Sequence, residues 1–192
     1  MKTACIQMRS GINRTKNVEE ACSLIAQAAD QGARLVVTPE MTNVLDRKKD
    51  RLFSDLPQEQ DLEEIGLFSD LAKDLGITLV IGSLAVALPE QDGQRKMANR
   101  SMVFGPDGEL ARYDKIHLFD VDLPTGESWR ESRMMQGGDE AILVKTDKTK
   151  IGLSICYDVR FPHLYRGLAK AGAEILTVPA AFTVPTGEAH WA

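Results

Sequence analysis

The chain has 192 residues, of which 43% are hydrophobic and 27% charged, and its formal net charge is −5. This length and composition predict one globular domain over residues 1–192, large enough to bury a core without disulfides or a structural metal. The acidic balance argues against binding nucleic acid or an anionic membrane surface, and no apolar run approaches the roughly 18 residues of a membrane span.

The N-terminus lacks the long apolar segment and cleavage site of a secretory signal, so a cytoplasmic location is expected. The cysteines Cys5, Cys22 and Cys156 form no C-x-x-C pair, and the histidines are widely spaced. We therefore expect no disulfide framework, no metal site and no cofactor. Cys5 and Cys22 are interpreted as buried, inert thiols on a strand and on the apolar face of a helix.

The first forty residues predict a strand, a helix and a second strand. Thr3 to Met8 is a short strand. In the following segment, apolar residues recur at three- and four-residue spacing, which is typical of a helix packed on one face. Asn17 and Glu20 resemble a capping box at its start, and Gly32 is a natural end. Residues 35–37 then form a continuous apolar strand.

The order of helix, glycine and strand recurs twice further along the chain. The recurrences are a helix over 62–75 with Gly76 and a strand over 78–81, and a helix over 164–171 with Gly172 and a strand over 175–178. Between them lie two strand pairs, 101–104 with 109–113 around a Pro-Asp-Gly turn, and 141–145 with 150–155. The pattern predicts an α/β protein with a mixed sheet covered by helices.

Three residues with chemical potential follow predicted strands. Glu40 comes after an apolar strand, where open α/β sheets bind ligands, although it could be a solvated loop acid. Lys115 follows a second strand and could be a surface residue or a compact cation for an oxyanion. Cys156 ends a third strand just before a helix, where helix N–H groups favour a thiolate, although an inert buried cysteine is the alternative. Together they supply a base, a cation and a nucleophile.

The chain resembles the nitrilase superfamily of carbon–nitrogen hydrolases. The matching stretches, in order, are Thr38-Pro39-Glu40, Tyr113–Asp120, Ile155–Pro162, Pro179–Thr183 and Thr186–Trp191. They cover all three signature regions of the superfamily, and the last two stretches are similar to the ω-amidase and deaminated-glutathione amidase branch.

This resemblance implies an αββα sandwich of the nitrilase type and a Glu-Lys-Cys triad of Glu40, Lys115 and Cys156. The family's second glutamate falls at Glu131, with Glu127 as the nearby competitor. The resemblance also implies a homodimer or higher homo-oligomer, with residues 161–171 as the candidate surface.

The mechanism implied by the resemblance is hydrolysis of a small primary amide through a thioester of Cys156, with release of ammonia. Glu40 acts as the base, and Lys115 with the Tyr157 backbone N–H holds the oxyanion. The branch favours a carboxylate-bearing amide. Candidate substrate-binding residues are Tyr157, Arg160, Phe182 and Thr183, although aromatic packing or structural ion pairing would also explain some of them.

The chain departs from the family pattern at its end, because the family continues well past the His-Trp stretch and this sequence stops at Ala192. The sandwich is therefore expected to be incomplete at the C-terminus. Three other interpretations stay open: an inactive amidase-like fragment or binding module, a nitrilase or N-carbamoyl amidohydrolase with another substrate, and a thiol redox sensor built on Cys156.

Overall fold

The computed structural model describes residues 1–46, 48–123 and 126–191, and at Lys49 the backbone only. Its strands are β1 (Thr3–Cys5), β2 (Leu35–Val37), β3 (Thr78–Ala87), β4 (Met97–Gly105), β5 (Gly108–Asp114), β6 (Asp120–Asp122), β7 (Ser128–Arg130), β8 (Leu143–Lys145), β9 (Lys150–Gly152) and β10 (Ile175–Leu176). The α-helices are α1 (Arg14–Asp30), α2 (Lys49–Asp55), α3 (Glu63–Leu75), α4 (Pro162–Lys170) and α5 (Val184–His190), and the 3-10 helices are η1 (Glu59–Asp61), η2 (Glu131–Arg133) and η3 (Cys156–Arg160).

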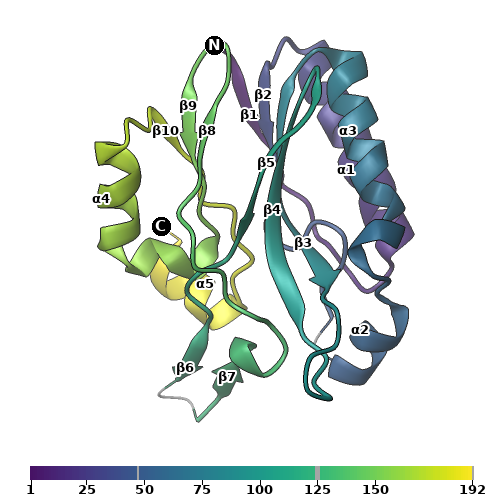
Figure 1. The fold of residues 1–192 in the computed structure, drawn as a ribbon, viewed down its shortest axis with the longest axis vertical. Coiled ribbons are helices and arrows are strands. Elements are labelled where there is room, and N and C mark those ends of the chain that lie inside the picture. The colour runs from purple at the N-terminus through teal and green to yellow at the C-terminus, as the bar shows by residue number, and fades with distance from the viewer. Residues whose placement is uncertain (47, 124–125, 192) are drawn as a thin grey trace.

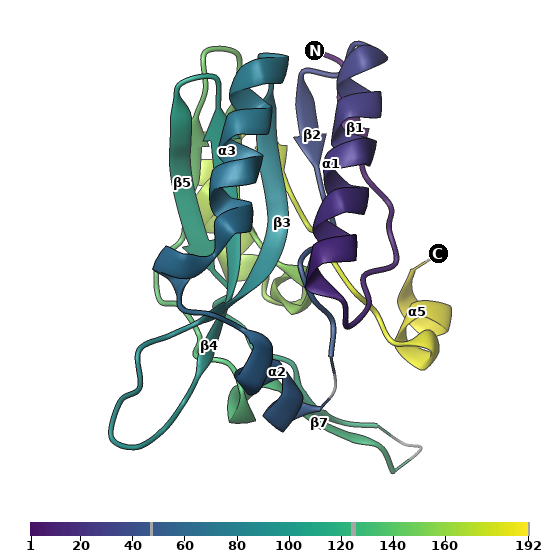
Figure 2. The same ribbon diagram turned by 90° about the vertical axis from the view of Figure 1, so that its right-hand side faces the viewer.

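The elements form four layers. The larger sheet has the strand order β1-β2-β3-β4-β5, the second sheet has the order β10-β9-β8, and β6 pairs with β7 in a separate hairpin. Helix α4 covers the outer face of the smaller sheet, and α1 and α3 lie side by side over the outer face of the larger one (Figures 1 and 2). This is an αββα arrangement, and the α/β class predicted from the sequence is confirmed.

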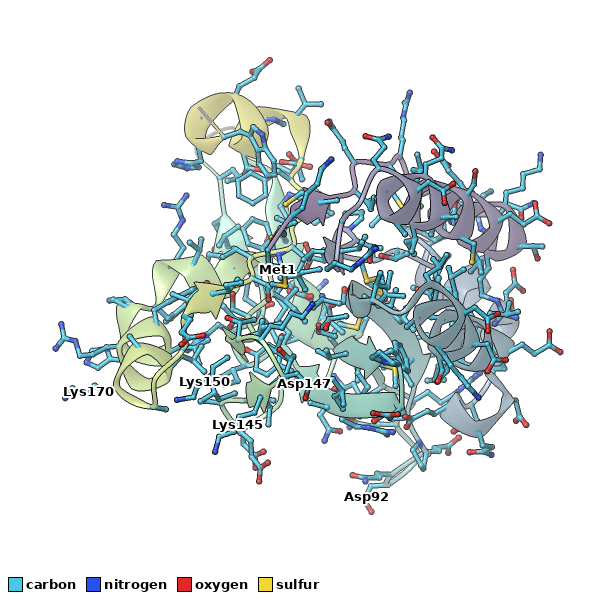
Figure 3. All side chains as sticks on the ribbon, turned by 90° about the horizontal axis from the view of Figure 1, so that it is seen from above. Met1, Asp92, Lys145, Asp147, Lys150 and Lys170 are labelled. Atoms are coloured by element: carbon cyan, nitrogen blue, oxygen red, sulfur yellow. The ribbon has the colours of Figure 1, made fainter. Side chains whose placement is uncertain are left out.

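Strand alternation divides the buried side chains between two cores. Leu79 and Ile81 point toward α1 and α3 and belong to the helix-side core, whereas Val80 between them points toward the second sheet. The core between the sheets also contains Cys156 at its border. Several lysine side chains lie on the side of the molecule away from α1 and α3 (Figure 3). They are Lys145 and Lys150 on the β8–β9 hairpin and Lys170 on α4.

Strand direction brings distant segments to one edge of the larger sheet. β2 pairs parallel to β3, while β4 runs antiparallel to both β3 and β5. β5 therefore runs in the same direction as β2, and the end of β2, the end of β5 and the start of β4 lie at the same edge. The segments after β2 and β5 carry Glu40 and Lys115, so the topology places two of the predicted residues near each other.

The close fit of the 38–43 segment depends on Gly82, which lies where β3 departs from regular register. A Cβ at Gly82 would lie 2.1 Å from the Thr38 carbonyl oxygen, 2.5 Å from the Pro39 carbonyl oxygen and 2.6 Å from Pro179 Cβ. The Gly82 N–H also donates to the Thr38 hydroxyl at 2.9 Å. Only glycine lets these backbones approach so closely.

Several details of the sequence prediction were wrong. Helix α1 begins earlier than Asn17, because the Asn13 side chain caps it by accepting from Lys16 N–H. Asn17 is buried inside the helix, where its amide bonds Gly11 and Asn43. Cys5 is exposed, because it lies on the edge strand β1.

The strand and helix lengths also differ in places. β3 and β4 are longer than predicted, whereas β1 and β9 are shorter, and α2, α5 and the β6–β7 pair were not predicted. The helix end at Gly76 is confirmed, since this residue adopts the left-handed conformation with φ +59°. Within the described ranges, no helix combines the length and apolar character needed to cross a bilayer.

We predict that Gly82→Ala destabilises the protein by about 3 kcal/mol or more, because the new methyl group overlaps two backbone oxygens. Denaturant unfolding followed by circular dichroism measures this change. The matched control is Gly66→Ala in α3, where a Cβ would have no heavy atom within 4 Å; there we expect a gain of about 0.5–1 kcal/mol. Equal stability of the two variants would contradict the steric argument.

Candidate active site

An ammonium group lies between two carboxylates at the edge of the larger sheet. Lys115 Nζ is 3.0 Å from Glu40 Oε1 and 2.9 Å from Glu131 Oε2. The Lys115 side chain is 2% exposed and that of Glu40 is 6% exposed. The Glu40 carboxylate also acts on the Cys156 thiol, whose pKa it raises. The structure thus brings Glu40, Lys115, Glu131 and Cys156 together from four separate segments.

The segment that carries Glu40 is held by hydrogen bonds to β3. The Met41 N–H donates to the Ser83 hydroxyl at 2.8 Å, and the Ser83 N–H donates to the Pro39 carbonyl at 3.2 Å. Met41 adopts a left-handed conformation with φ +56°, which turns the chain directly after Glu40. This buried turn fixes the direction of the carboxylate, because its backbone is anchored on both sides.

The two carboxylates keep Lys115 charged. Burial by itself lowers the pKa of an ammonium group, but Glu40 and Glu131 outweigh that effect and hold the pKa of Lys115 above its usual value. The Lys115 N–H donates to the Asn99 carbonyl at 3.0 Å, so the backbone is anchored to β4 as well. Lys115 is therefore a fixed positive charge in a dry environment.

Glu131 and Glu127 occupy different places. Glu131 lies in η2 and contacts Lys115, and its Oε2 also accepts from the Phe119 N–H at 2.7 Å. Glu127 lies in the connection between β6 and β7, where its carbonyl accepts from the Leu123 N–H at 2.8 Å. The structure therefore places Glu131 against Lys115.

Cys156 begins η3 in a strained conformation. Its φ is +46°, a left-handed value that a non-glycine residue rarely adopts, and its N–H donates to the Pro179 carbonyl at 2.9 Å. Strain of this kind concentrates at functional sites.

The sequence argument that helix N–H groups favour a thiolate at Cys156 is not supported. The residue begins a short 3-10 helix and not an α-helix. Burial raises the pKa of the Cys156 thiol and the Glu40 carboxylate raises it further, whereas Lys115 and the Ala181 N–H lower it only in part. The Cys156 thiol therefore holds its proton more tightly than a free cysteine does.

Asp158 connects the segment of Cys156 with the segment of Lys115. Its side chain is fully buried and accepts from the Ile155 N–H at 2.8 Å and from the Tyr113 hydroxyl at 2.6 Å. It also accepts from the His117 N–H at 3.0 Å and contacts His117 Nδ1 at 2.7 Å. One carboxylate therefore ties the turn after β9 to the turn after β5, across the interface of the two sheets.

The predicted substrate-binding residues are dispersed around this centre. Tyr157 is half-buried and makes edge contacts with Phe119 and Phe161, with ring centroids 5.1 and 5.5 Å apart. Arg160 is exposed at the end of η3. Phe182 packs against Trp191, and the Thr183 hydroxyl caps α5 by accepting from the Thr186 N–H. Thr183 and Phe182 thus have structural contacts, whereas Arg160 has no ion pair in the described part of the chain.

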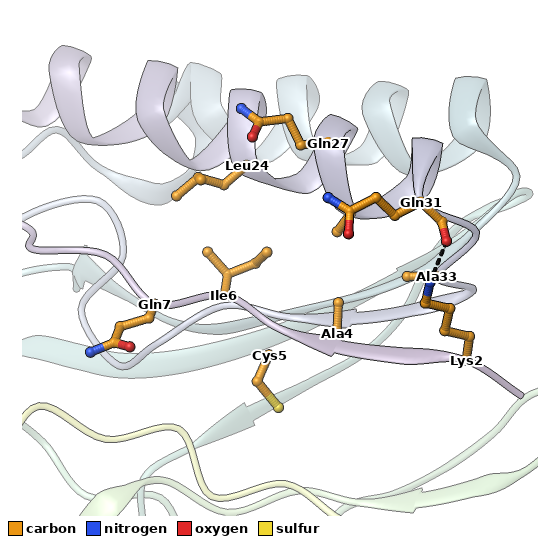
Figure 4. Close-up of a pocket in the computed structure, with 10 residues that line it drawn as sticks. Lys2, Ala4, Cys5, Ile6, Gln7, Leu24, Gln27, Gln31 and Ala33 are labelled. Carbon is orange, nitrogen blue, oxygen red and sulfur yellow. Dashed lines mark hydrogen bonds between the residues drawn. The ribbon is translucent and has the colours of Figure 1, made fainter.

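Two further features of the described residues lie apart from this centre. A surface pocket between β1 and α1 is lined by Cys5, Leu24 and Gln31 among others, and none of the predicted site residues borders it (Figure 4). Within residues 1–46, 48–123 and 126–191, no cluster of histidine, cysteine, aspartate or glutamate has the arrangement to hold a metal ion.

Sequence reasoning missed Asn99, Tyr113 and Asp158. Asn99 and Asp158 are polar residues in stretches that are buried almost throughout, Met97–Gly105 and Ile151–Asp158. A polar side chain inside such a run needs hydrogen-bond partners, which is the signal that could have identified both.

Comparisons with known proteins identify the family of the chain. The profile of the carbon-nitrogen hydrolase family matches residues 2–192. The human omega-amidase NIT2 is 39% identical over 191 residues, which are 99% of this chain and 67% of that protein. The deaminated glutathione amidase of Synechocystis sp. is also 39% identical, over 98% of this chain and 69% of its own length. The chain spans about two thirds of the length of these relatives.

Solved structures show the same fold. The Caenorhabditis elegans NitFhit protein superimposes with a TM-score of 0.84 and 34% identity, covering 100% of this chain and 47% of that chain. Saccharomyces cerevisiae Nit3, a member of branch 10 of the nitrilase superfamily, has a TM-score of 0.76 and 28% identity, over 95% of this chain and 64% of its own. The nitrilase-type fold expected from the sequence motifs is confirmed.

The raised pKa of Cys156 can be measured by alkylation. With Cys5→Ser and Cys22→Ala, Cys156 is the remaining cysteine, and we expect its reaction with iodoacetamide to rise with pH around a midpoint above the ordinary thiol value of about 8.5. Glu40→Gln removes a negative charge, so the midpoint should fall. Glu20→Gln on the exposed face of α1 is the control and should leave it unchanged. A midpoint unaffected by Glu40→Gln would contradict the assigned cause.

Proposed function

The chain belongs to the carbon–nitrogen hydrolase family, and we propose that it hydrolyses the primary amide of a small carboxylate-bearing compound through a thioester of Cys156. One observation carries the proposal: the buried Lys115 ammonium lies 3.0 Å from the Glu40 carboxylate, which also raises the pKa of the neighbouring Cys156 thiol. A base, a nucleophile and a fixed cation therefore share one site.

In the first half of the reaction, Glu40 accepts the thiol proton while the sulfur attacks the amide carbonyl carbon. The carbon–sulfur bond forms, and the carbonyl electron pair moves to oxygen. When the tetrahedral intermediate collapses, the carbon–nitrogen bond breaks and Glu40 delivers the proton to the departing nitrogen. Ammonia leaves and an acyl thioester remains on Cys156.

In the second half, Glu40 removes a proton from water, and the oxygen attacks the thioester carbon. The carbon–sulfur bond breaks, the proton returns to the sulfur, and the carboxylic acid is released. The net reaction consumes one amide and one water and yields one acid and one ammonia. Glu40 ends in its starting state, so the same carboxylate serves both half-reactions.

Two donors are placed to stabilise the oxyanion of each intermediate. The Lys115 ammonium donates to Glu40 and to both oxygens of Glu131, and its positive charge would stabilise an oxyanion placed beside it. The Tyr157 N–H, directly after the nucleophile, has no acceptor among the described residues. A single donor of this kind contributes about 3–4 kcal/mol to the transition state.

Two relatives support the substrate class. One is named an omega-amidase and another a deaminated glutathione amidase, so an amide that also carries a carboxylate is the favoured substrate for this chain. Arg160 lies in the same five-residue helix as Cys156 and offers an unengaged guanidinium for the substrate carboxylate. Phe182 and Thr183 directly follow Ala181, whose N–H donates to Glu40. They would therefore border the substrate beside Glu40.

We also propose that residues 1–192 act as one catalytic domain, that the protein forms a homodimer, and that it works in the cytoplasm. Helix α4 buries Leu164 and Leu168 and leaves its opposite face exposed, which supports a contact surface over residues 161–171. All three cysteines are free, which is typical of a reducing compartment.

Ammonia release from a panel of amides tests the proposed function on this chain. We expect turnover of ω-amides of small dicarboxylic acids and of deaminated glutathione, and loss of at least about 10³-fold in kcat for Cys156→Ser. Mass spectrometry should detect the acyl adduct on Cys156. Cys5→Ser is the matched control and should retain full activity. Absence of ammonia with every amide would instead favour an inactive fragment or a binding module, and turnover of nitriles or carbamoyl amino acids would redirect the substrate class.

Arg160→Met tests recognition of the substrate carboxylate. The change keeps the apolar length of the side chain and removes its charge, so we expect KM for a carboxylate-bearing amide to rise about tenfold or more, with kcat little changed. A neutral amide of equal length should be unaffected. Arg9→Met, at an exposed position after β1 and outside residues 161–171, is the control. Equal effects on charged and neutral amides would rule out this role for Arg160.

A further inference from the structure

Asn99 is the residue that links both carboxylates of the site. It lies on β4 and is 1% exposed. Its Nδ2 donates to Glu40 Oε1 at 2.9 Å and to Glu131 Oε1 at 3.1 Å. The two carboxylate acceptors fix the orientation of the amide, because the opposite orientation would direct Oδ1 at two negative groups.

The other half of the amide has no partner. Asn99 Oδ1 is buried without a hydrogen bond in the described structure. An unpaired buried carbonyl costs about 1–3 kcal/mol of stability. An asparagine at this position is therefore poorly explained by folding stability, and its two donated hydrogen bonds are the interactions that the site gains from it.

Asn99 also touches the third member of the group through its backbone. Its carbonyl accepts from the Lys115 N–H at 3.0 Å, where β4 and β5 separate. The same residue thus contacts Glu40, Glu131 and Lys115. β4 lies between β3 and β5 in the larger sheet and is hydrogen-bonded to both. The three charged groups are therefore all held by a residue on a rigid strand.

We propose that Asn99 is a positioning residue that holds the Glu40 and Glu131 carboxylates around the Lys115 ammonium and keeps Glu40 directed at the Cys156 thiol. The proposal rests on the amide hydrolysis proposed above. Asn99 acts through Glu40 and Glu131 and touches no reacting atom.

The chemistry of the site explains why an amide suits this position. The two glutamates and one lysine carry a net charge of about −1 in a buried space, and Glu40 must remain a base. A second cation would compete for the Glu40 electron pair, and a third carboxylate would repel the first two. An amide N–H₂ donates to both carboxylates without a charge and does not titrate.

The isosteric variant Asn99→Leu tests donation separately from shape. Leucine has the same branched outline, lacks both donors and also lacks the unpaired oxygen. We expect kcat for the amide to fall about 10- to 100-fold while KM changes less than about threefold. If Asn99 only fills space, kcat of the variant should equal that of the wild type, and that result would overturn the proposal.

Ser101→Ala is the matched control for stability. Ser101 lies two residues further on the same face of β4, and its hydroxyl donates to the Ile81 carbonyl at 2.9 Å. We expect this variant to lose about 1 kcal/mol in denaturant unfolding and to keep kcat. Asn99→Leu should lose no more stability than Ser101→Ala yet lose activity. Should Asn99→Leu fail to fold, Asn99→Ala is measured by the same criteria.

A crystal structure of Asn99→Leu separates this proposal from the proposed function. We expect the Glu40 carboxylate to leave its place 3.0 Å from Lys115 Nζ. If wild-type chain releases no ammonia, the hydrolase proposal fails, and this structural result still decides the role of Asn99. Carboxylates that stay in place in the variant would refute the positioning role whatever the activity.

Discussion

The buried ammonium of Lys115 between Glu40 and Glu131 is the interaction on which the site depends. A charge removed from water is costly unless it is paired and fully hydrogen-bonded. Here each carboxylate has further donors: Ala181 N–H on Glu40 at 2.8 Å and Phe119 N–H on Glu131 at 2.7 Å. The pairing therefore constrains four segments at once, since displacement of any one would leave a buried charge without a partner. The arrangement is rigid before any substrate enters.

The fold supplies this rigidity through two contacts between layers. Gly82 allows the turn after β2 to pack directly against β3 and against Pro179, which follows the second sheet. Asp158 bonds backbone and side-chain donors on both sides of the same boundary. Burial and its bond to Asp158 also raise the pKa of Tyr113, so that phenol stays a donor at any physiological pH. The two sheets are thus joined by polar contacts close to Cys156. Hydrogen bonds fix the orientation of the groups they join, which apolar packing alone would not do.

The sequence predicts Glu40, Lys115 and Cys156 because each follows an apolar strand. The end of such a strand can be predicted from the local sequence pattern. It favours Glu131 over Glu127 only through the family resemblance, since the local pattern does not show how the β6–β7 hairpin turns back to β5. The capping argument at Asn17 failed for a similar reason: its amide bonds Asn43, distant in sequence. The sequence did not identify Asn99, because its hydrogen bonds to Glu40 and Glu131 are contacts between distant segments. The local pattern around Asn99 shows only a buried strand. Local chemistry is therefore predictable here, and the supporting contacts are not.

The contacts of His117 explain why the proposed reaction uses a carboxylate as its base, where other cysteine hydrolases use a histidine. His117 is close in sequence to Lys115, but its ring stacks on Phe161 with centroids 3.7 Å apart, and its Nδ1 contacts Asp158. It is held as a structural element, and no histidine contacts Cys156 among the described residues. In the proposed reaction the Cys156 thiol therefore passes its proton to Glu40. Burial makes the separated thiolate unfavourable at rest, and a substrate carbonyl placed against Lys115 would remove that penalty by accepting the sulfur's charge. The proposed reaction therefore couples proton transfer to formation of the carbon–sulfur bond, so that the thiol is activated only when a substrate is present.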